Sequence, residues 1–201
     1  MIPFYGPDRP ELFEIERRTM DRPGKVIEAL DRVLPDGRVL DVGAGNGFTA
    51  GRLTKGRIVV PMEPAAGMVD PTVDLPWVRG DAEHLPFADG AFDAAYATWA
   101  YFFSGFGDVS VGVDEARRVS KGPVAIVDNL GGDEFEALAV GPISADVGWW
   151  EAAGFELVEI ETAFVFDSVD EARTLLGFFF GDPGAAWTRP DIQVRVGLCV
   201  G

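Results

Sequence analysis

Three alternating glycines, at positions 43, 45 and 47, directly follow a short apolar run that contains Asp41. The run Val39–Val42 predicts a buried strand. The glycines predict a tight turn, because glycine tolerates positive φ and lets a ligand approach the backbone closely. The chain from Phe48 on can begin a helix, whose first backbone N–H groups are available as donors. A glycine-rich turn between a strand and a helix is typical of a nucleotide-binding site.

Two details of this turn favour S-adenosylmethionine over a dinucleotide. Phe48 occupies the place of the third glycine in the dinucleotide pattern G-x-G-x-x-G. The carboxylate of Asp41 would repel a pyrophosphate and attract an amino group. A nicotinamide-dependent oxidoreductase on the same general fold is therefore a disfavoured alternative, and a purely structural glycine turn is another.

A second acid is spaced as a nucleotide site requires. Glu63 is the last residue of the expected strand 57–63, twenty residues after Gly43. An acid at the carboxyl end of the neighbouring strand can accept hydrogen bonds from both ribose hydroxyls. We therefore expect Glu63 to bind the ribose of the cofactor.

Two motifs carry a resemblance to a known family. The pattern D-x-G-x-G-x-G at 41–47 resembles the first motif of the class I S-adenosylmethionine-dependent methyltransferases. The run GDAEHLPFADGAFDA at 80–94 is similar to G-D-A-x-x-L-P-F-x-D-x-x-F-D of the type 11, ubiquinone/menaquinone-biosynthesis-like family. Residues 115–122 resemble that family's E-x-x-R-V-L-K-P-G-G, except that Gly122-Pro123 replaces the proline and glycine pair. The resemblance covers about residues 37–160.

The resemblance also implies roles for individual residues. Asp81 would accept a hydrogen bond from the adenine amino group, and the N–H of Ala82 would bond the adenine ring. The expected cofactor-binding residues are Asp41, Gly43, Ala44, Gly45, Asn46, Gly47, Glu63, Pro64, Met68, Asp81, Ala82 and Thr98.

The segment 98–104 at the end of the fourth expected strand is aromatic, which suits an apolar substrate or a sulfonium. The candidate substrate-pocket residues are Tyr5, Trp99, Tyr101, Phe102 and Asn129. No catalytic residue is assigned: Tyr101, Asp128 and His84 are weak candidates for a base. No metal site is expected.

The pattern of apolar residues predicts the α/β class. Strands are expected at 38–42, 57–63, 77–81, 92–98, 124–128, 155–166 and 192–200, and helices at 11–20, 23–34, 108–120, 145–153 and 168–180. The resemblance implies a three-layer, doubly wound, Rossmann-like sheet of seven strands, mostly parallel with an antiparallel last strand. We expect one domain over 1–201, with 1–36 as an N-terminal helical leader and a possible lid.

Composition narrows the function further. The 201 residues carry a net charge of −16 and one cysteine, Cys199. The negative charge disfavours nucleic acids, and no apolar stretch reaches the length of a membrane span. We expect a cytoplasmic monomer or homodimer that transfers a methyl group from S-adenosyl-L-methionine to a small molecule by in-line displacement. The alternative is an inactive methyltransferase-fold module that acts through cofactor or protein binding.

Overall fold

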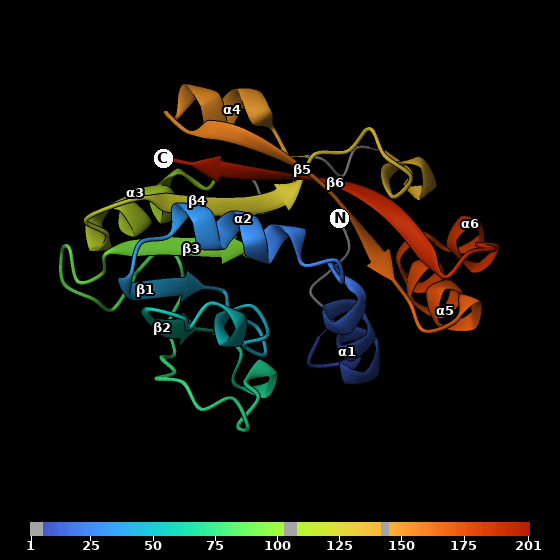
Figure 1. The fold of residues 1–201 in the computed structure, drawn as a ribbon, viewed down its shortest axis with the longest axis horizontal. Helices are drawn as coiled ribbons and strands as arrows, with labels where there is room; N and C mark the ends of the chain where they lie inside the picture. The colour runs from blue at the N-terminus through green and yellow to red at the C-terminus, as the bar shows by residue number, and fades with distance from the viewer. Residues whose placement is uncertain (1–5, 103–107, 142–144) are drawn as a thin grey trace.

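The computed structural model describes residues 6–102, 108–141 and 145–201, and these residues form one six-stranded sheet (Figure 1). The strands are β1 (Gly37–Val42), β2 (Arg57–Met62), β3 (Ala94–Thr98), β4 (Val124–Asn129), β5 (Glu156–Val165) and β6 (Asp191–Val200). Their order in the sheet is β2-β1-β3-β4-β6-β5. β6 pairs antiparallel with β4 and β5, and the remaining pairs are parallel. The expected doubly wound α/β sheet with an antiparallel last strand is therefore confirmed, with six strands in place of seven.

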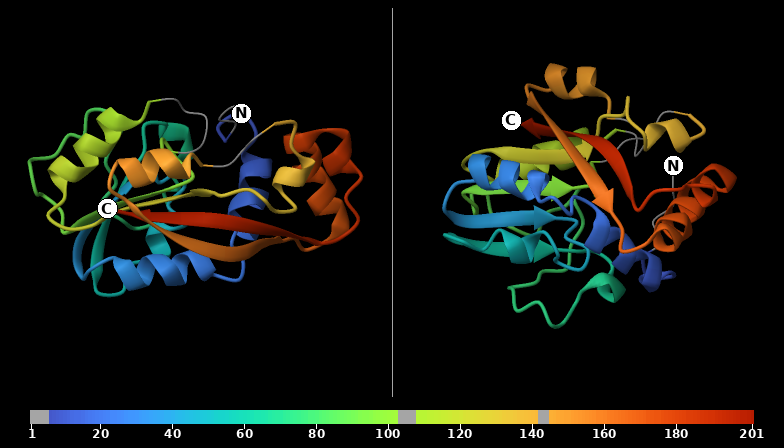
Figure 2. Two further views of the ribbon diagram at one scale, coloured as in Figure 1. Left: turned by 90° about the horizontal axis from the view of Figure 1, so that it is seen from above. Right: turned by 45° about the vertical axis from the view of Figure 1, so that its right-hand side comes forward.

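Helices lie on both faces of the sheet and at one end of it (Figures 1 and 2). Their bounds are Pro10–Thr19 (α1), Lys25–Val33 (α2), Ser110–Val119 (α3), Val147–Ala152 (α4), Val169–Phe180 (α5) and Asp182–Ala185 (α6). α2 lies on one face, and α3 and α4 lie on the other. α1 stands beyond the carboxyl ends of β1 and β3, beside the end of the molecule that carries α5 and α6. α1 and α2 both lie within residues 1–36, and the role of this segment as a leader or lid stays a prediction.

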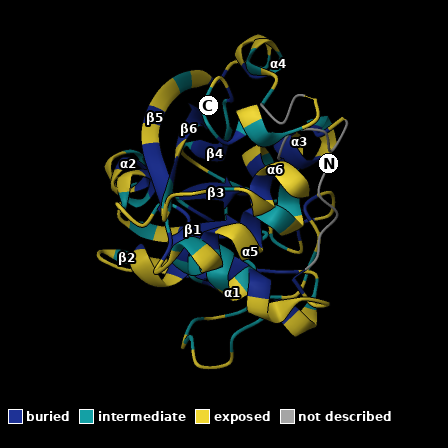
Figure 3. Ribbon diagram, turned by 90° about the vertical axis from the view of Figure 1, so that its right-hand side faces the viewer, coloured by how far each residue is buried: buried dark blue, intermediate teal, exposed yellow. Residues whose placement is uncertain are grey.

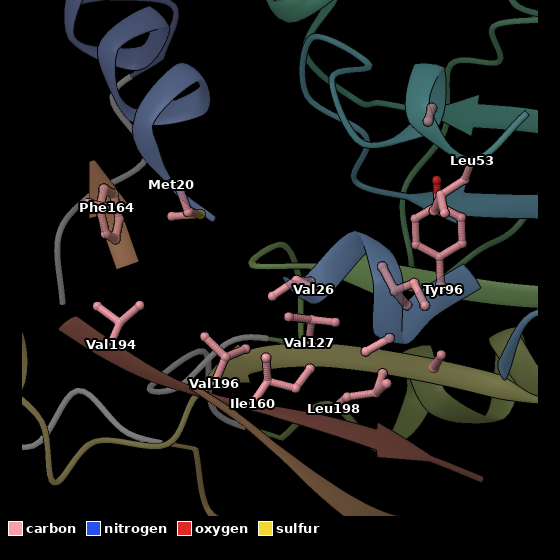
Figure 4. Close-up of a cluster of buried hydrophobic side chains, with 14 of the residues drawn as sticks. Met20, Val26, Leu53, Tyr96, Val127, Ile160, Phe164, Val194, Val196 and Leu198 are labelled. Atoms are coloured by element: carbon pink, nitrogen blue, oxygen red, sulfur yellow. The ribbon is translucent and has the colours of Figure 1, made fainter. Parts of the chain in front are cut away.

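Alternating side chains of the central strands build two separate cores. Val39, Tyr96 and Val127 point toward α2 and belong to the first core, and ten of its side chains are labelled in Figure 4. Leu40 and Ile126 point toward α3 and belong to the second. This alternation follows from the period of two in a strand. Figure 3 shows the result: the central strands are buried, and exposed residues lie on the outer helices and on parts of the edge strands.

The expected third strand over 77–81 is wrong. Only one parallel bridge forms, between Met62 and Val78, with hydrogen bonds from Val78 N to Pro61 O and from Glu63 N to Val78 O. Pro76 and Gly80 flank this short run. Proline lacks an N–H, and glycine weakens a strand, so the pairing does not extend.

The regular helix expected after the glycine turn does not form. The structure has a three-residue 3₁₀ turn, Ala50–Arg52, and the chain enters β2 five residues later. Gly51 lies inside this turn, four residues after Gly47. Each glycine costs about 1 kcal/mol of helix stability relative to alanine, so a regular helix is disfavoured here.

The helical leader is tied to β5 and α5 by polar contacts. The Asp21 carboxylate accepts hydrogen bonds from Lys25 N and Val26 N at the start of α2, and from Thr162 Oγ1 in β5. Arg18 of α1 contacts Asp167 and Glu171 beside α5. Among the described residues, no helix is long and apolar enough to cross a bilayer.

Candidate functional site

The glycine turn folds as the sequence predicts and is attached to the end of β2. Gly43, Gly45 and Gly47 have φ angles of +74°, +56° and +79°, the left-handed region that favours glycine. The N–H groups of Gly43 and Ala44 donate to the carbonyl of Met62 at 2.9 and 3.0 Å. The turn between β1 and the 3₁₀ helix therefore lies directly against the carboxyl end of β2.

Two of these glycines allow close packing that a side chain would prevent. A Cβ on Gly43 would lie 2.5 Å from the Cβ of Ala100, and a Cβ on Gly47 would lie 2.8 Å from the ring of Trp77. Contacts under 3 Å force the neighbouring groups apart. The turn is thus packed between the segment after β3 and the segment before residue 78.

The remaining glycine of the turn, Gly45, faces the N-terminal helix α1. A Cβ on Gly45 would lie 3.3 Å from Cζ of Phe13 in α1. Close by, Gly6 approaches Met68 so tightly that a Cβ there would lie 2.5 Å from its sulfur. The N-terminal segment therefore covers the glycine turn and the residues after β2.

Glu63 is placed where a ribose acceptor is expected. Its side chain lies at the carboxyl end of β2 and is 6% exposed. Oε2 accepts a hydrogen bond from Gly45 N and Oε1 accepts one from Ala65 N, both at 2.9 Å. Burial raises the pKa of Glu63, and these two backbone donors oppose the rise. Since each carboxylate oxygen has two lone pairs, Glu63 can hold the turn and still accept from a ligand hydroxyl.

Asp41 lies beneath the turn and is deeply buried. It is 1% exposed, and it stands opposite Tyr96 in the register of β1 and β3. Neither Asp41 oxygen nor the Tyr96 hydroxyl makes a hydrogen bond of regular geometry with a described residue. Burial raises the pKa of Asp41 to about 7, the Tyr96 hydroxyl lowers it, and the charge of Glu63 adds to the rise. The proposed contact of Asp41 with an ammonium group stays a prediction.

The loop that begins at Asp81 reaches the same edge of the sheet. Its carboxylate is exposed, and Oδ1 accepts from Glu83 N at 3.1 Å and lies 3.3 Å from Nδ1 of His84. Ala82, the other expected adenine contact, is buried. Gly80 packs on Met62 of β2, where a Cβ would lie 2.9 Å from the sulfur. An exposed carboxylate at this position is accessible to an amino group of a ligand.

Arg118 and Glu115 of α3 hold this loop in place. Arg118 donates to the carbonyls of Leu85 and Phe87 and contacts the carboxylates of Asp89 and Glu115. Glu115 in turn accepts from Leu85 N at 2.8 Å. The hydrogen bond from Arg118 lowers the pKa of Glu115. The E-x-x-R spacing in α3 is therefore explained by its contacts with the Leu-Pro-Phe loop.

We expect Arg118→Met to lower the free energy of unfolding by about 1–3 kcal/mol, because two loop carbonyls and two carboxylates lose a shared donor. Urea denaturation measures this change. Arg117→Met, one residue earlier and bonded to the Ala153 carbonyl, is the matched control, with an effect below about 1 kcal/mol. Equal losses for both variants would contradict the role of Arg118 as the clamp.

The ends of β3 and β4 bring together part of the expected substrate pocket. Nε1 of Trp99 donates to Oδ1 of Asn129 at 3.0 Å. Tyr101 is partly exposed, and its hydroxyl donates to Oε1 of Glu83 at 2.8 Å. Burial, and then the contact with Glu83, raises the pKa of Tyr101 to about 12, so Tyr101 keeps its proton at neutral pH and is a poor base.

Other expected pocket and cofactor residues have different surroundings. Phe102 is 3% exposed and packs on Trp150, so in this structure it is a core residue rather than a pocket wall. Thr98 is buried, with its hydroxyl 3.5 Å from that of Thr49. Tyr5 lies outside the described residues.

The remaining expected cofactor residues surround the turn. Asn46 accepts from Phe48 N at 3.2 Å through its side chain, which stabilises the turn itself. Pro64 is exposed beside Glu63, and Met68 is buried under Gly6. The described residues contain no cluster of His, Cys, Asp or Glu side chains suited to a metal ion.

Sequence reasoning missed three side chains that contact this region. Trp77 lies on Gly47, Phe13 lies on Gly45, and Arg17 lies over the ring of Trp99. Phe13 and Arg17 are four residues apart on α1, and helical spacing places such a pair on one face. Nothing in the sequence says which element that face meets, so the contact with the glycine turn needed the structure.

Comparisons with known proteins agree with this arrangement. Residues 40–125 match the type 11 methyltransferase family, described as a methyltransferase domain. A demethylmenaquinone methyltransferase of Corynebacterium kroppenstedtii is 39% identical over 90 residues, which are 43% of this chain and 38% of that protein. A demethylmenaquinone methyltransferase of Thermobifida fusca is 29% identical over 170 residues, which are 75% of this chain and 69% of that protein. The first of these alignments thus spans well under half of the relative.

Solved structures share the fold at low identity. An S-adenosylmethionine-dependent methyltransferase of Thermotoga maritima aligns with 98% of this chain and 99% of its own, with a TM-score of 0.60 and 18% identity. The YcgJ protein of Bacillus subtilis aligns with 89% of this chain and 96% of its own, with a TM-score of 0.57 and 20% identity. The sheet and its glycine turn therefore define a class I S-adenosylmethionine-dependent methyltransferase fold.

Within this class, residues 40–125 match the type 11 methyltransferase family, as the motifs predict. S-adenosylmethionine is the cofactor of that family, and the domain match therefore confirms the expected cofactor. The residues at the carboxyl edge fit such a group: the buried carboxylate of Glu63 lies against the glycine turn, where a ribose is expected, and Asp41 has buried oxygens without a regular hydrogen bond.

Proposed function

We propose that this protein is an S-adenosylmethionine-dependent methyltransferase that acts on a small, largely apolar molecule. The observation that carries the proposal is the meeting of three segments at one edge of the sheet. The glycine turn contacts Met62, Glu63 accepts from Gly45 N, and the segment that leads to Asp81 pairs with β2 at Val78. Ligands of open α/β sheets bind at this edge.

The roles proposed for the chain follow from these contacts. Glu63 accepts from the ribose hydroxyls, and Asp81 accepts from the adenine amino group. The cofactor supplies an activated methyl group on a sulfonium sulfur. Trp99 and Tyr101, at the end of β3, orient the acceptor and exclude water, which suits transfer by in-line displacement. No residue is assigned as a general base, and Tyr101, one of the three weak candidates, holds its proton.

The class of methyl acceptor is proposed from the net charge, the partly exposed aromatic rings and the names of related proteins. The net charge of −16 disfavours polyanionic acceptors such as nucleic acids. Partly exposed aromatic rings at the carboxyl edge favour a small apolar or aromatic acceptor. The related demethylmenaquinone methyltransferases, by name, act on demethylmenaquinone, and quinones are therefore the first class of compound to screen. A cytoplasmic location and a monomeric or dimeric state remain predictions.

Calorimetric titration with S-adenosylhomocysteine tests the proposal. We expect micromolar binding by the wild-type chain and a loss of about 10- to 100-fold for Asp81→Ala, because one charge-assisted hydrogen bond contributes about 1.5–3 kcal/mol. Asp81 is exposed, so the free energy of unfolding should stay within about 0.5 kcal/mol of wild type. Asp74→Ala, another exposed carboxylate, is the control and should bind as wild type does.

The alternative of an inactive module has a distinct outcome. A folded wild-type chain that binds neither S-adenosylmethionine nor S-adenosylhomocysteine would contradict the proposed activity. It would favour a methyltransferase-fold module that acts through protein association.

A further inference from the structure

A glycine inside α3 makes room for an aromatic ring. Gly112 is the third residue of this helix and is buried. Glycine is, apart from proline, the least favourable residue in a helix, so its presence there calls for a packing reason. A Cβ on Gly112 would lie 2.4 Å from Cε1 of Tyr101 and 3.2 Å from Cε1 of Phe102. The ring of Tyr101 therefore lies directly against the backbone of α3.

The ring of Tyr101 is held on a second side as well. It meets the buried ring of Phe102 edge to face, with the ring centres 5.1 Å apart. Aromatic pairs in this geometry attract each other. Packing against Gly112 and Phe102 thus fixes the direction in which the phenol hydroxyl of Tyr101 points.

That hydroxyl reaches the loop that begins at Asp81. It donates to Oε1 of Glu83 at 2.8 Å, between residues 18 positions apart in the chain. A hydrogen bond to a carboxylate is stronger than one between neutral groups. The C-terminal half of α3 holds residues 85–87 of the same loop, whereas Tyr101 holds it two residues from Asp81.

Glu83 belongs to the tight turn that presents Asp81. Oδ1 of Asp81 accepts from Glu83 N at 3.1 Å, and Asp81 forms an isolated antiparallel bridge with His84. The two carboxylates of this turn repel each other, because like charges lie two residues apart. The hydroxyl of Tyr101 gives the charge of Glu83 a partner, and the side chain of Asp81 stays 62% exposed.

The charges around the phenol agree with a lasting donor. Burial is the largest of the causes that raise the pKa of Tyr101 to about 12, and the contact with Glu83 and the charges of Asp108 and Asp81 add to it. The hydroxyl keeps its proton over the whole neutral range and remains a donor there.

We propose that Tyr101 is a positioning residue for the adenine end of the cofactor: its hydroxyl holds Glu83 in place, so that the neighbouring Asp81 faces the adenine amino group. The inference rests on the proposed function and adds to it a residue that acts on adenine through Glu83. Tyr101 follows β3, so it also joins the adenine loop to the segment where the acceptor is expected.

The test compares S-adenosylhomocysteine with the analogue whose adenine lacks the 6-amino group. Wild type should prefer the first ligand by about 10- to 100-fold in calorimetry, because Asp81 accepts one charge-assisted hydrogen bond from that group. Tyr101→Phe keeps the ring on Gly112 and removes the hydroxyl. We expect its preference to fall about three- to tenfold, with the affinity for the analogue within about twofold of wild type.

Three further variants trace the effect to Glu83. Glu83→Ala should lower the preference as Tyr101→Phe does, and the double variant should show no further loss, because the two residues act through one hydrogen bond. Glu83→Gln keeps an acceptor oxygen and should retain more of the preference. Asp74→Ala, an exposed carboxylate ahead of the loop, is the control and should match wild type.

Each outcome decides the proposal. An unchanged preference in Tyr101→Phe, or losses that add in the double variant, would overturn it. A parallel loss for both ligands would show a general structural effect and would also overturn it. If Tyr101→Phe does not fold, the exposed Glu83→Ala makes the same comparison.

The wild-type chain separates this inference from the proposed function. Equal binding of both ligands by wild type would remove the adenine role of Asp81, and with it the role of Tyr101, while the cofactor assignment would stand. A wild-type chain that binds neither ligand would overturn the proposed function itself.

Discussion

Glu63→Ala should weaken S-adenosylhomocysteine binding by about 100-fold or more, the largest effect expected of a single substitution in the cofactor site. The variant loses the acceptors of both ribose hydroxyls, and two charge-assisted hydrogen bonds contribute about 3–4 kcal/mol together. It also leaves the N–H groups of Gly45 and Ala65 without their present acceptor. Calorimetry measures the binding loss directly.

The same substitution should destabilise the fold. Two part-buried backbone donors lose their partner, which costs about 2–4 kcal/mol in the free energy of unfolding. Glu63→Gln keeps one acceptor oxygen and the size of the side chain, so its effects should be intermediate. Glu156→Gln, an exposed acid at the start of β5, is the control and should change neither property. Undiminished binding by folded Glu63→Ala would rule out the ribose role.

Asp41→Asn should change how stability depends on pH. Burial raises the pKa of Asp41 from 3.8 to about 7 in the folded chain. The unfolded chain therefore loses this proton at lower pH than the folded chain does. The free energy of unfolding of wild type falls as the pH rises from about 4 to about 7 and then levels off. A pKa shift of this size lowers the free energy of unfolding above pH 7 by on the order of 4 kcal/mol.

The asparagine variant lacks this titration. Relative to wild type, it should gain about 2–3 kcal/mol of stability between pH 5 and pH 8, because wild type develops most of its cost in that range. Tyr96 faces Asp41 across the register and Glu63 lies nearby, and both remain in the variant. Urea denaturation at the two pH values measures the difference, and Asp74→Asn is the exposed control. Parallel pH profiles for wild type and Asp41→Asn would contradict the raised pKa.

Local patterns were enough to predict most elements. The apolar face of 23–34 predicts a helix that forms as α2, and the alternation over 155–166 predicts a strand that forms as β5. Ser168 caps α5 by accepting from Glu171 N, as the S-x-x-E spacing indicates. The glycine turn was also predictable, since positive φ at three positions is a local requirement.

Two segments whose local sequence only weakly favours a strand or a helix were not predicted correctly. Residues 77–81 look like a strand but form a single bridge, because Pro76 and Gly80 stop the pairing on either side. The segment after Gly47 looks like a helix but forms one 3₁₀ turn. In both places local preference is weak, and the packing of Trp77 on Gly47 and of the neighbouring loops decides the outcome.

The sequence by itself predicted the resemblance to the type 11 methyltransferases and the acids and glycines expected around the cofactor, because motif residues act through local backbone geometry and their own chemistry. Only the tertiary structure decided which residues meet. It buried Asp41 beneath the turn, placed Phe102 in the core, and brought Arg17 of α1 over Trp99, which follows β3 far away in the chain. Such contacts join residues distant in sequence. No periodicity encodes them, because they follow from how the apolar faces of α1, α2 and α5 pack against one sheet.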